Sequence, residues 1–378
     1  MSRSFNAIRS CIVPAVLVLC LTAGTYPALA GGKKIPIIHS TDLFHPHDDP
    51  DDHYDLATLF ALDEFDIKGI VLDSGRQPDA QLKRFGGPPI EQMMKITGRK
   101  VPYAIGLSHR LNSPGDKALD QEQRFQAGIE LIFSVLRESD KQVTYHAAGS
   151  LRNLAAAFNR EPELLKRKLK AVYIEIGRGP SGEQREWNVT LDPYSFALVI
   201  ESGLPVYWCP CFGTDGYATY YTADQSAVVG ACLPAVQNFF VYCLTQSKAD
   251  PIEFLSTGPH SLPTGERKMW CTAPLIHAAG RKIYRRGPDD FVALQPADAA
   301  KAGLADKLVE ALRFVPMRAA VGRLPRPGGE DGKPTRLSLD VKLNPKQNHN
   351  GFIFQQNDEQ YSRIMPSVLK NLLAELGK

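Results

Sequence analysis

The sequence lacks the features that mark membrane-spanning and nucleic-acid-binding chains. After the first thirty residues no run of about eighteen apolar residues occurs, which is the length that a membrane span needs. The net charge is only +3, and the basic residues are scattered instead of forming a stripe with interleaved aromatic residues. Hydrophobic residues make up 43% and charged residues 22% of the 378 residues, as in ordinary globular proteins. We therefore expect a soluble domain that binds neither nucleic acid nor membrane.

The first thirty residues form a separate segment. Arg3 and Arg9 precede an apolar run at 11–22, and small residues at 28–30 stand where a signal peptidase cleaves. The apolar run is short for a membrane span. We expect residues 1–30 to be a cleaved signal peptide and the protein to be secreted or periplasmic.

Cysteine is scarce, with 7 residues in the whole chain. Those after residue 30 are Cys209, Cys211, Cys232, Cys243 and Cys271. Their number is odd, so at least one thiol stays free even if an exported protein oxidises a pair. Cys209 and Cys211 are too close for an easy disulfide and too few for a zinc site. We expect most of these cysteines to act as small buried hydrophobic residues.

Strand and helix patterns alternate from residue 34 onward. Apolar, β-branched runs predict strands at 34–39 and 67–72, and helical spacing predicts a helix at 54–62 between them. The same alternation continues with expected strands at 101–105, 143–147, 171–176 and 206–209, and with expected helices at 90–96, 121–138, 151–158 and 193–202. This pattern predicts an open α/β fold in one domain at 31–378, with a mostly parallel sheet flanked by helices. Ligands bind such sheets beyond the carboxyl ends of the strands.

The pattern weakens after about residue 215. Helical spacing predicts helices at 223–244, 272–279 and 362–376. Residues 320–350 are rich in proline, glycine, lysine and asparagine, which predicts a long loop or arm.

The densest polar segment, residues 42–55, lies between the first expected strand and the first expected helix. It holds six aspartates and three histidines. Carboxylates this close repel one another, so we expect them to bind a cation. Oxygen ligands favour Ca²⁺ or Mg²⁺ over softer metals.

Two other interpretations of this acidic segment stay open. Asp51 and Asp52 stand where carboxylates cap the start of a helix, so the segment could be a solvated capping loop. His45 and His47 could instead hold zinc or iron.

Five further patterns occur in a fixed order between about residues 35 and 215. They are Ser40-Thr41-Asp42 with Asp51-Asp52 and Asp66–Ile70, then Val143–Ala155 with its Gly149-Ser-Leu-Arg-Asn153, then Glu161–Leu164, then Glu186-Trp187-Asn188 with Asp192-Pro193, and last Glu201–Val206. Their order and spacing resemble those of the inosine–uridine-preferring nucleoside hydrolase superfamily. The resemblance implies a Rossmann-like, nucleoside-hydrolase-like fold.

The resemblance also implies an activity, namely hydrolysis of the N-glycosidic bond of ribonucleosides through an oxocarbenium-like sugar. It implies Ca²⁺, or another divalent metal, that holds the ribose hydroxyls and activates a water. By the resemblance, Asp42 is a metal ligand and the general base, Asp52 is a second metal ligand, and the backbone carbonyl of Ala148 completes part of the metal shell. The implied sugar contacts are Asp51, Glu186 and Asn188. The resemblance further implies a homo-oligomer with a small-molecule substrate.

The sequence departs from the family pattern in places that concern the site. About five extra residues separate Asp42 from Asp51, and among them Asp48 and Asp49 are candidate additional metal ligands. The family's late His-Asp pair is absent, and the best local match is 269–272, Met-Trp-Cys-Thr. The remaining candidate contacts to a sugar or base are Arg76, which replaces a sugar-binding asparagine, and the tryptophans Trp187 and Trp270.

Two further functions stay open at this point. One is a nucleoside- or carbohydrate-binding protein that has kept the pocket and lost catalysis. The other is a different metal-dependent hydrolase that uses the His/Asp-rich segment on a phosphoester or glycoside. Outside that segment, His146 falls in an expected strand, where we interpret it as a satisfied buried histidine and not as a ligand.

Overall fold

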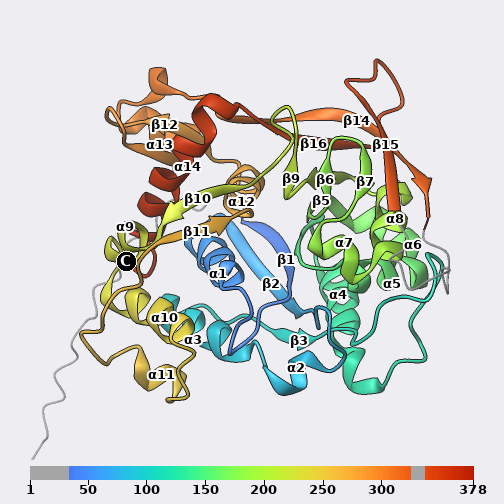
Figure 1. The fold of residues 1–378 in the computed structure, drawn as a ribbon, viewed down its shortest axis with the longest axis horizontal. Helices are drawn as coiled ribbons and strands as arrows, with labels where there is room; N and C mark the ends of the chain where they lie inside the picture. The colour runs from blue at the N-terminus through green and yellow to red at the C-terminus, as the bar shows by residue number, and fades with distance from the viewer. Residues whose placement is uncertain (1–33, 325–336) are drawn as a thin grey trace, which may run out of the picture. The chain divides into compact units, whose positions relative to one another are not determined.

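Ten strands form one sheet in the computed structural model, which describes residues 34–324 and 337–378 (Figure 1). Its order is β3-β2-β1-β4-β5-β8-β16-β14-β15-β7. The strands are β1 (Ile35–Thr41), β2 (Phe65–Leu72), β3 (Tyr103–Ile105), β4 (Val143–Ala148), β5 (Leu169–Glu175), β7 (Gly182–Gln184), β8 (Val206–Cys209), β14 (Leu312–Arg323), β15 (Leu337–Leu343) and β16 (Gly351–Gln356). Neighbours from β3 to β16 run parallel, and β14, β15 and β7 add an antiparallel edge. The expected open, mostly parallel α/β fold is confirmed.

Strand β1 lies inside the sheet, between β2 and β4. Its consecutive residues Ile37 and Ile38 are both fully buried, but they belong to two different hydrophobic cores. Successive side chains of a strand point to opposite faces, so both faces of β1 are covered. This explains why the strand is almost continuously apolar, as strands of parallel sheets are.

Two layers of helices cover the sheet, and Figure 1 shows them on either side of the parallel strands. One layer shares a core with Ile37 and contains α1 (Asp51–Ala61), α3 (Gly87–Thr97), α10 (Pro234–Leu244), α12 (Thr272–Ala278) and α14 (Asp358–Leu373). The other shares a core with Ile38 and contains α4 (Ala127–Glu138), α5 (Arg152–Arg160), α6 (Pro162–Lys168) and α8 (Pro193–Glu201).

Shorter elements connect these layers. The short helices are α2 (Ala80–Lys83), α7 (Trp187–Leu191), α9 (Gln225–Gly230), α11 (Pro251–Phe254) and α13 (Pro296–Lys301), with 3-10 turns at Gln123–Phe125 and Ala305–Lys307. Three two-stranded ribbons pair β6 (Arg178–Gly179) with β9 (Phe212–Gly213), β10 (Tyr221–Asp224) with β11 (Glu266–Met269), and β12 (Lys282–Arg285) with β13 (Phe291–Leu294).

The expected helix at 223–244 is wrong in its extent. The segment begins in β10 and then divides into α9 and α10. The Asp224 side chain accepts a hydrogen bond from the Ala227 amide and so starts α9. Pro234 occupies the first turn of α10, where its missing N–H costs nothing, and it prevents α9 from continuing into α10.

The expected loop or arm at 320–350 is also wrong in part, because β14 extends to Arg323 and β15 occupies Leu337–Leu343. Apolar residues alternate with polar ones along β15, and Leu337 and Leu339 are buried while Asp340 is exposed. This period of two is a strand signal that the composition of the wider segment concealed. Residues 325–336 lie outside the described residues, as does the expected signal peptide.

The five cysteines of the described chain are all free and all buried. Cys209, Cys232 and Cys271 belong to hydrophobic cores, and Cys211 and Cys271 also line the cavity described below. No helix in the described ranges combines the length and apolar character that a bilayer span requires.

Candidate functional site

A cavity of about 810 Å³ opens beyond the carboxyl ends of the parallel strands. Asp42 follows β1, Arg76 follows β2, and Ala148 and Glu175 are the last residues of β4 and β5. This is the edge at which open α/β sheets bind ligands. The lining does not include His45 or His47, but it includes every residue that the resemblance and its departures assigned to a metal or a sugar: Asp42, Asp48, Asp49, Asp51, Asp52, Arg76, Ala148, Glu186, Trp187 and Asn188.

Three aspartates form an acidic cluster in this cavity: Asp42 after β1, and Asp51 and Asp52 in the first turn of α1. Burial and, as the second cause, repulsion from Asp73 together raise the pKa of Asp42 to about 8. Burial, followed by repulsion from their acidic neighbours, raises the pKa of Asp51 and of Asp52 well above the usual range. The carboxylates of the cluster are therefore stable only when they are protonated or when a cation is bound to them.

Two backbone and side-chain contacts hold this acidic cluster in place. The Asp42 amide donates to the Ala148 carbonyl at 3.3 Å, which ties β1 to β4 beside the cluster. The Thr41 hydroxyl donates to the Asp52 carboxylate. The capping interpretation of the acidic segment is not what the structure shows, because the N-cap of α1 is Pro50 and no side chain caps the helix.

The inserted residues contact the cavity rim instead of its centre. Asp48 pairs with Arg84, and Asp49 pairs with Arg267 at 3.3 Å. Both aspartates are largely exposed. Each of these carboxylates therefore already has a cationic partner, unlike the three of the acidic cluster.

The histidines of the insertion do not line the cavity. His45 Nε2 lies 2.8 Å from the Ser247 carbonyl oxygen, and its ring stacks on Tyr242 of α10 at 4.5 Å. His47 packs edge-on against His53 at 5.9 Å. The contacts of His45 fix the inserted loop against α10. Among the described residues, His45 and His47 belong to no group of three or more His, Cys, Asp or Glu side chains with ligand atoms close enough to share a metal ion.

Glu186 and Asn188 form one wall, and both are fixed by the backbone around α7. The Glu186 carboxylate caps α7, accepting from the amides of Asn188 at 2.8 Å and Gly177 at 2.9 Å. The Asn188 side-chain amide donates to the Glu175 carbonyl at 3.0 Å. Burial raises the pKa of Glu186. These hydrogen bonds therefore fix the positions from which Glu186 and Asn188 line the cavity.

Aromatic side chains form the outer part of the cavity. The Arg76 guanidinium lies 4.4 Å from the ring centroid of Trp187, a cation–π contact, and Trp187 is 52% exposed. The Trp270 indole N–H donates to the Cys211 carbonyl at 3.1 Å, and its ring meets Phe212 at 5.9 Å. These flat surfaces suit a planar ring such as a nucleobase.

Behind the cavity, Arg152 and Asp73 form a buried ion pair at 3.4 Å. Arg152 also donates to the carbonyls of Gly75 at 2.8 Å and Ser108 at 3.1 Å, and to the Ser150 hydroxyl at 2.8 Å. These bonds hold the loop that carries Arg76. Sequence reasoning missed Arg152, although it lies inside the Gly149–Asn153 pattern.

Sequence reasoning also missed the cavity floor, which includes Asp55, Glu175 and Cys271, with His146 next to Glu175. The sequence pattern could have indicated two of these residues. Asp55 follows Asp51 and Asp52 at the spacing that puts side chains on one helix face. Glu175 is a single carboxylate at the end of a buried apolar strand, and such a group needs a partner.

Comparison with known proteins agrees with this geometry. A family model described as inosine-uridine preferring nucleoside hydrolase matches residues 37–259. The pyrimidine-specific ribonucleoside hydrolase RihA of Enterobacter sp. (strain 638) is 30% identical over 192 residues, which cover 46% of this chain and 58% of RihA. RihA of Citrobacter koseri is 29% identical over the same shares of both chains. The chain thus spans 58% of the length of these curated relatives.

Solved structures share the fold at low sequence identity. An inosine-guanosine nucleoside hydrolase is 15% identical with a TM-score of 0.52, covering 90% of this chain and 98% of its own. A purine-preferring ribonucleoside hydrolase from Gardnerella vaginalis is 14% identical with a TM-score of 0.51, covering 90% and 99%. The family match covers more than half of the chain and contains the acidic cluster and the Glu186 wall. The resemblance inferred from the sequence is therefore confirmed, and the chain belongs to the inosine-uridine preferring nucleoside hydrolase family.

Proposed function

We propose that this protein hydrolyses the N-glycosidic bond of a ribonucleoside-type small molecule with the help of a divalent cation. The observation that carries the proposal is the convergence of Asp42, Asp51 and Asp52 with Glu186 and Asn188 on one cavity. The pyrimidine and purine ribonucleoside hydrolases named above support the same class of substrate. The experiment below determines which nucleobase this chain prefers in its substrate.

The donor atoms of the acidic cluster fit a hard cation such as Ca²⁺. They are carboxylate oxygens of three residues that repel one another, and the Ala148 carbonyl lies beside them. We propose Asp42, Asp52 and the Ala148 carbonyl as the ligands of this ion, because oxygen-only sets are those that Ca²⁺ and Mg²⁺ take. When bound, the ion would orient the sugar hydroxyls and acidify a water.

The residues of the chain can perform the remaining steps. Asp42 would accept the proton of the attacking water as the general base. Asp51 would accept hydrogen bonds from the sugar hydroxyls, with Glu186 and Asn188 on the opposite wall. As the bond from the anomeric carbon to the base nitrogen breaks, its electron pair leaves with the base, which takes up a proton, and the water oxygen bonds to the anomeric carbon. The positive charge that develops on the sugar would be stabilised by the acidic cluster. The aromatic side chains would hold the leaving base.

The test is ribose release by the full chain from a panel of purine and pyrimidine ribonucleosides, with Ca²⁺ and with chelator. We expect release with Ca²⁺, none with chelator, and none from Asp52→Asn. Calorimetric titration with Ca²⁺ runs in parallel, and Asp52→Asn should abolish binding there too. If nucleosides bind to the folded protein without ribose release under any condition, the protein is a binding protein and the proposed hydrolysis is refuted.

Trp187→Ala should weaken substrate binding more than it slows the reaction. The loss of one stacking surface costs roughly 0.5–1.5 kcal/mol, which is about a 2- to 10-fold rise in KM with kcat nearly unchanged. Because Trp187 is 52% exposed, the melting temperature should hardly change. Leu119→Ala, at a 69% exposed position outside the cavity lining, is the matched control and should leave both constants unchanged. A fall in kcat at constant KM would contradict a stacking role.

A further inference from the structure

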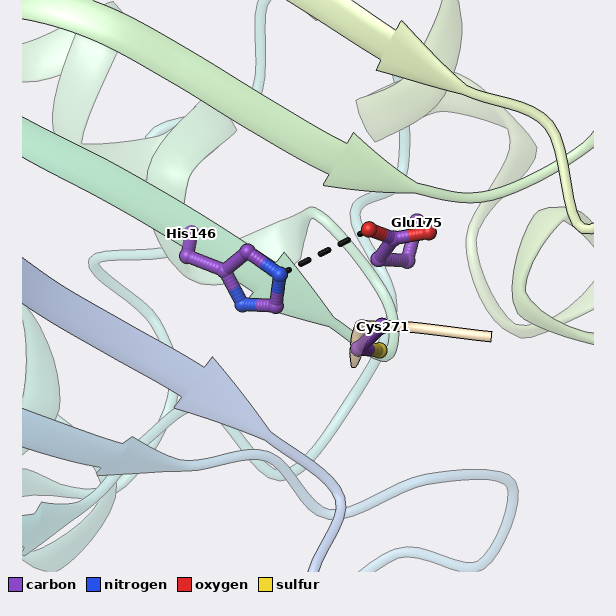
Figure 2. A group of neighbouring side chains, drawn as sticks. All are labelled: His146, Glu175 and Cys271. Atoms are coloured by element: carbon purple, nitrogen blue, oxygen red, sulfur yellow. Dashed lines mark ion pairs between the residues drawn. The ribbon is translucent and has the colours of Figure 1, made fainter. Parts of the chain in front are cut away.

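Three buried side chains with metal-binding atoms meet at the cavity floor, next to the acidic cluster. Figure 2 shows His146 from β4, Glu175 from the end of β5 and Cys271 from the segment before α12 converging on one point. One ligand atom from each, a ring nitrogen, a carboxylate oxygen and the sulfur, lies within 4.8 Å of the other two. Neither His146 nor Glu175 has a role in the hydrolysis proposed above.

The spacing is close to that of a tetrahedral metal site. His146 Nε2 lies 3.6 Å from Glu175 Oε1. In a tetrahedral zinc site with bonds of about 2.0–2.3 Å, ligand atoms are about 3.3–3.8 Å apart. The histidine and the glutamate already have this separation. Cys271 Sγ lies within 4.8 Å of both atoms, so it reaches ligand distance with a shift of at most about 1.5 Å.

The second observation is that the atoms facing one another have no hydrogen-bond partner. His146 Nε2 and Glu175 Oε1 are both unpaired within the described part of the chain, and their side chains are 0% and 2% exposed. Asp55 Oδ1 is also buried and unpaired within the same described residues, although the Asp55 carboxylate accepts hydrogen bonds from the thiol and the amide of Cys271. Buried polar atoms in native proteins nearly always have partners, so three such atoms in one place point to a missing ligand.

The surrounding bonds orient these atoms as a ligand set requires. His146 Nδ1 lies 3.0 Å from His39 Nδ1. Burial lowers the pKa of both rings, to about 3 for His39, so both are neutral and only one of the two nitrogens carries the shared proton. When that proton is on His146, its Nε2 has a free lone pair, which is how an outer partner prepares a histidine for a metal. The Thr219 hydroxyl donates to Glu175 Oε2 at 3.4 Å, and Oε1 has no hydrogen-bond partner among the described residues, although the Cys209 thiol also lies against this carboxylate.

We propose that His146 Nε2, Glu175 Oε1 and Cys271 Sγ hold a borderline-soft divalent cation of the zinc class, with Asp55 as the neighbouring fourth donor. A nitrogen, oxygen and sulfur set selects zinc or cobalt over calcium, in contrast to the oxygen-only acidic cluster. Glu175, Cys271 and Asp55 all line the cavity, so the ion would face it. Burial raises the pKa of Glu175 and of the Cys271 thiol, and a bound cation would displace those protons.

Cobalt absorption tests this site independently of hydrolysis. Chelator-treated full chain is titrated with Co²⁺ in excess Ca²⁺. We expect one cobalt per chain, with thiolate-to-cobalt charge transfer in the near ultraviolet and the visible bands of tetrahedral cobalt, all bleached by Zn²⁺. Asp52→Asn should keep the spectrum, because it changes only the acidic cluster. Absence of these bands in the wild-type chain would overturn the proposal.

Substitutions then assign the ligands. Cys271→Ser should remove the thiolate band and weaken Co²⁺ binding roughly 100-fold or more, since losing only an outer-shell partner already costs about 10- to 100-fold. Cys232→Ser, at another buried free cysteine that does not line the cavity, is the matched control and should keep the band. If circular dichroism shows that Cys271→Ser is unfolded, Glu175→Gln, which preserves side-chain volume, takes its place. A spectrum and affinity unchanged by the folded variant would refute the site.

Discussion

Asp42→Asn is expected to abolish ribose release and, at the same time, to stabilise the metal-free protein. As the proposed general base and cation ligand, Asp42 should contribute at least about 10²- to 10⁴-fold to the rate. The effect on stability has a separate cause, because the ionised form of this carboxylate is disfavoured in the folded chain. Burial, followed by repulsion from Asp73, raises its pKa to about 8.

The sign of the stability effect follows from this pKa. An aspartate in the unfolded chain titrates near 4, so between about pH 4 and pH 8 the folded metal-free protein binds a proton that the unfolded chain does not. The contribution of Asp42 to stability is therefore most favourable below pH 4 and becomes less favourable as the pH rises toward 8. Asparagine does not titrate, and its advantage over aspartate should be small at pH 5 and largest at pH 8. Thermal unfolding of both proteins in chelator, at pH 5 and at pH 8, measures this difference in stability.

Two controls sharpen this result. Asp289→Asn changes a largely exposed carboxylate far along the chain, and its effect should be small and equal at both pH values. Saturating Ca²⁺ should raise the melting temperature of the wild type at pH 8 and leave that of Asp42→Asn unchanged. An advantage of Asn that is the same at pH 5 and pH 8, or ribose release by the variant, would be inconsistent with the proposed role.

Arg152→Met should destabilise the protein by about 3–5 kcal/mol, the usual cost of removing one partner of a buried ion pair. Asp73 is fully buried, and Arg152 is its ion-pair partner at 3.4 Å. The substitution also leaves the carbonyls of Gly75 and Ser108 without the donors that they have now. Urea unfolding of the chelated protein measures the loss.

The matched control is Arg137→Met, which breaks the exposed ion pair with Glu161 and should cost less than about 1 kcal/mol. The double variant Arg152→Met/Asp73→Asn should recover part of the stability, because the unpaired buried charge is then gone. If Arg152→Met costs no more than Arg137→Met, the buried pair does not stabilise the fold.

The fold could be predicted because its signals are local. Most of the parallel strands are short apolar runs that alternate along the chain with helices of regular spacing, so neighbouring residues suffice to identify them. The exception is β16, where no strand was expected. β15 was missed because its alternation is short and lies in a segment of loop-like composition. Its place in the sheet depends on pairing with β14 and β7, which no local pattern reveals.

The acidic cluster could be predicted for the same reason, because Asp42, Asp51 and Asp52 are close in the sequence. The partners of Asp48 and Asp49 could not be predicted, since Arg84 and Arg267 follow them by 36 and 218 residues. The residues of the cavity floor could not be predicted for the same reason. His146, Glu175 and Cys271 come from three distant segments, and only the sheet and α12 bring them together.

The position of β1 has a consequence for how the protein loses function under stress. Because β1 pairs on both sides and is covered on both faces, its amides can exchange with solvent only when the sheet itself opens. Asp42 directly follows this strand and is bonded through its amide to β4. The Asp42 carboxylate is therefore held by a part of the molecule that unfolds only with the sheet. Local opening elsewhere in the molecule therefore need not displace Asp42, whereas opening of the sheet must.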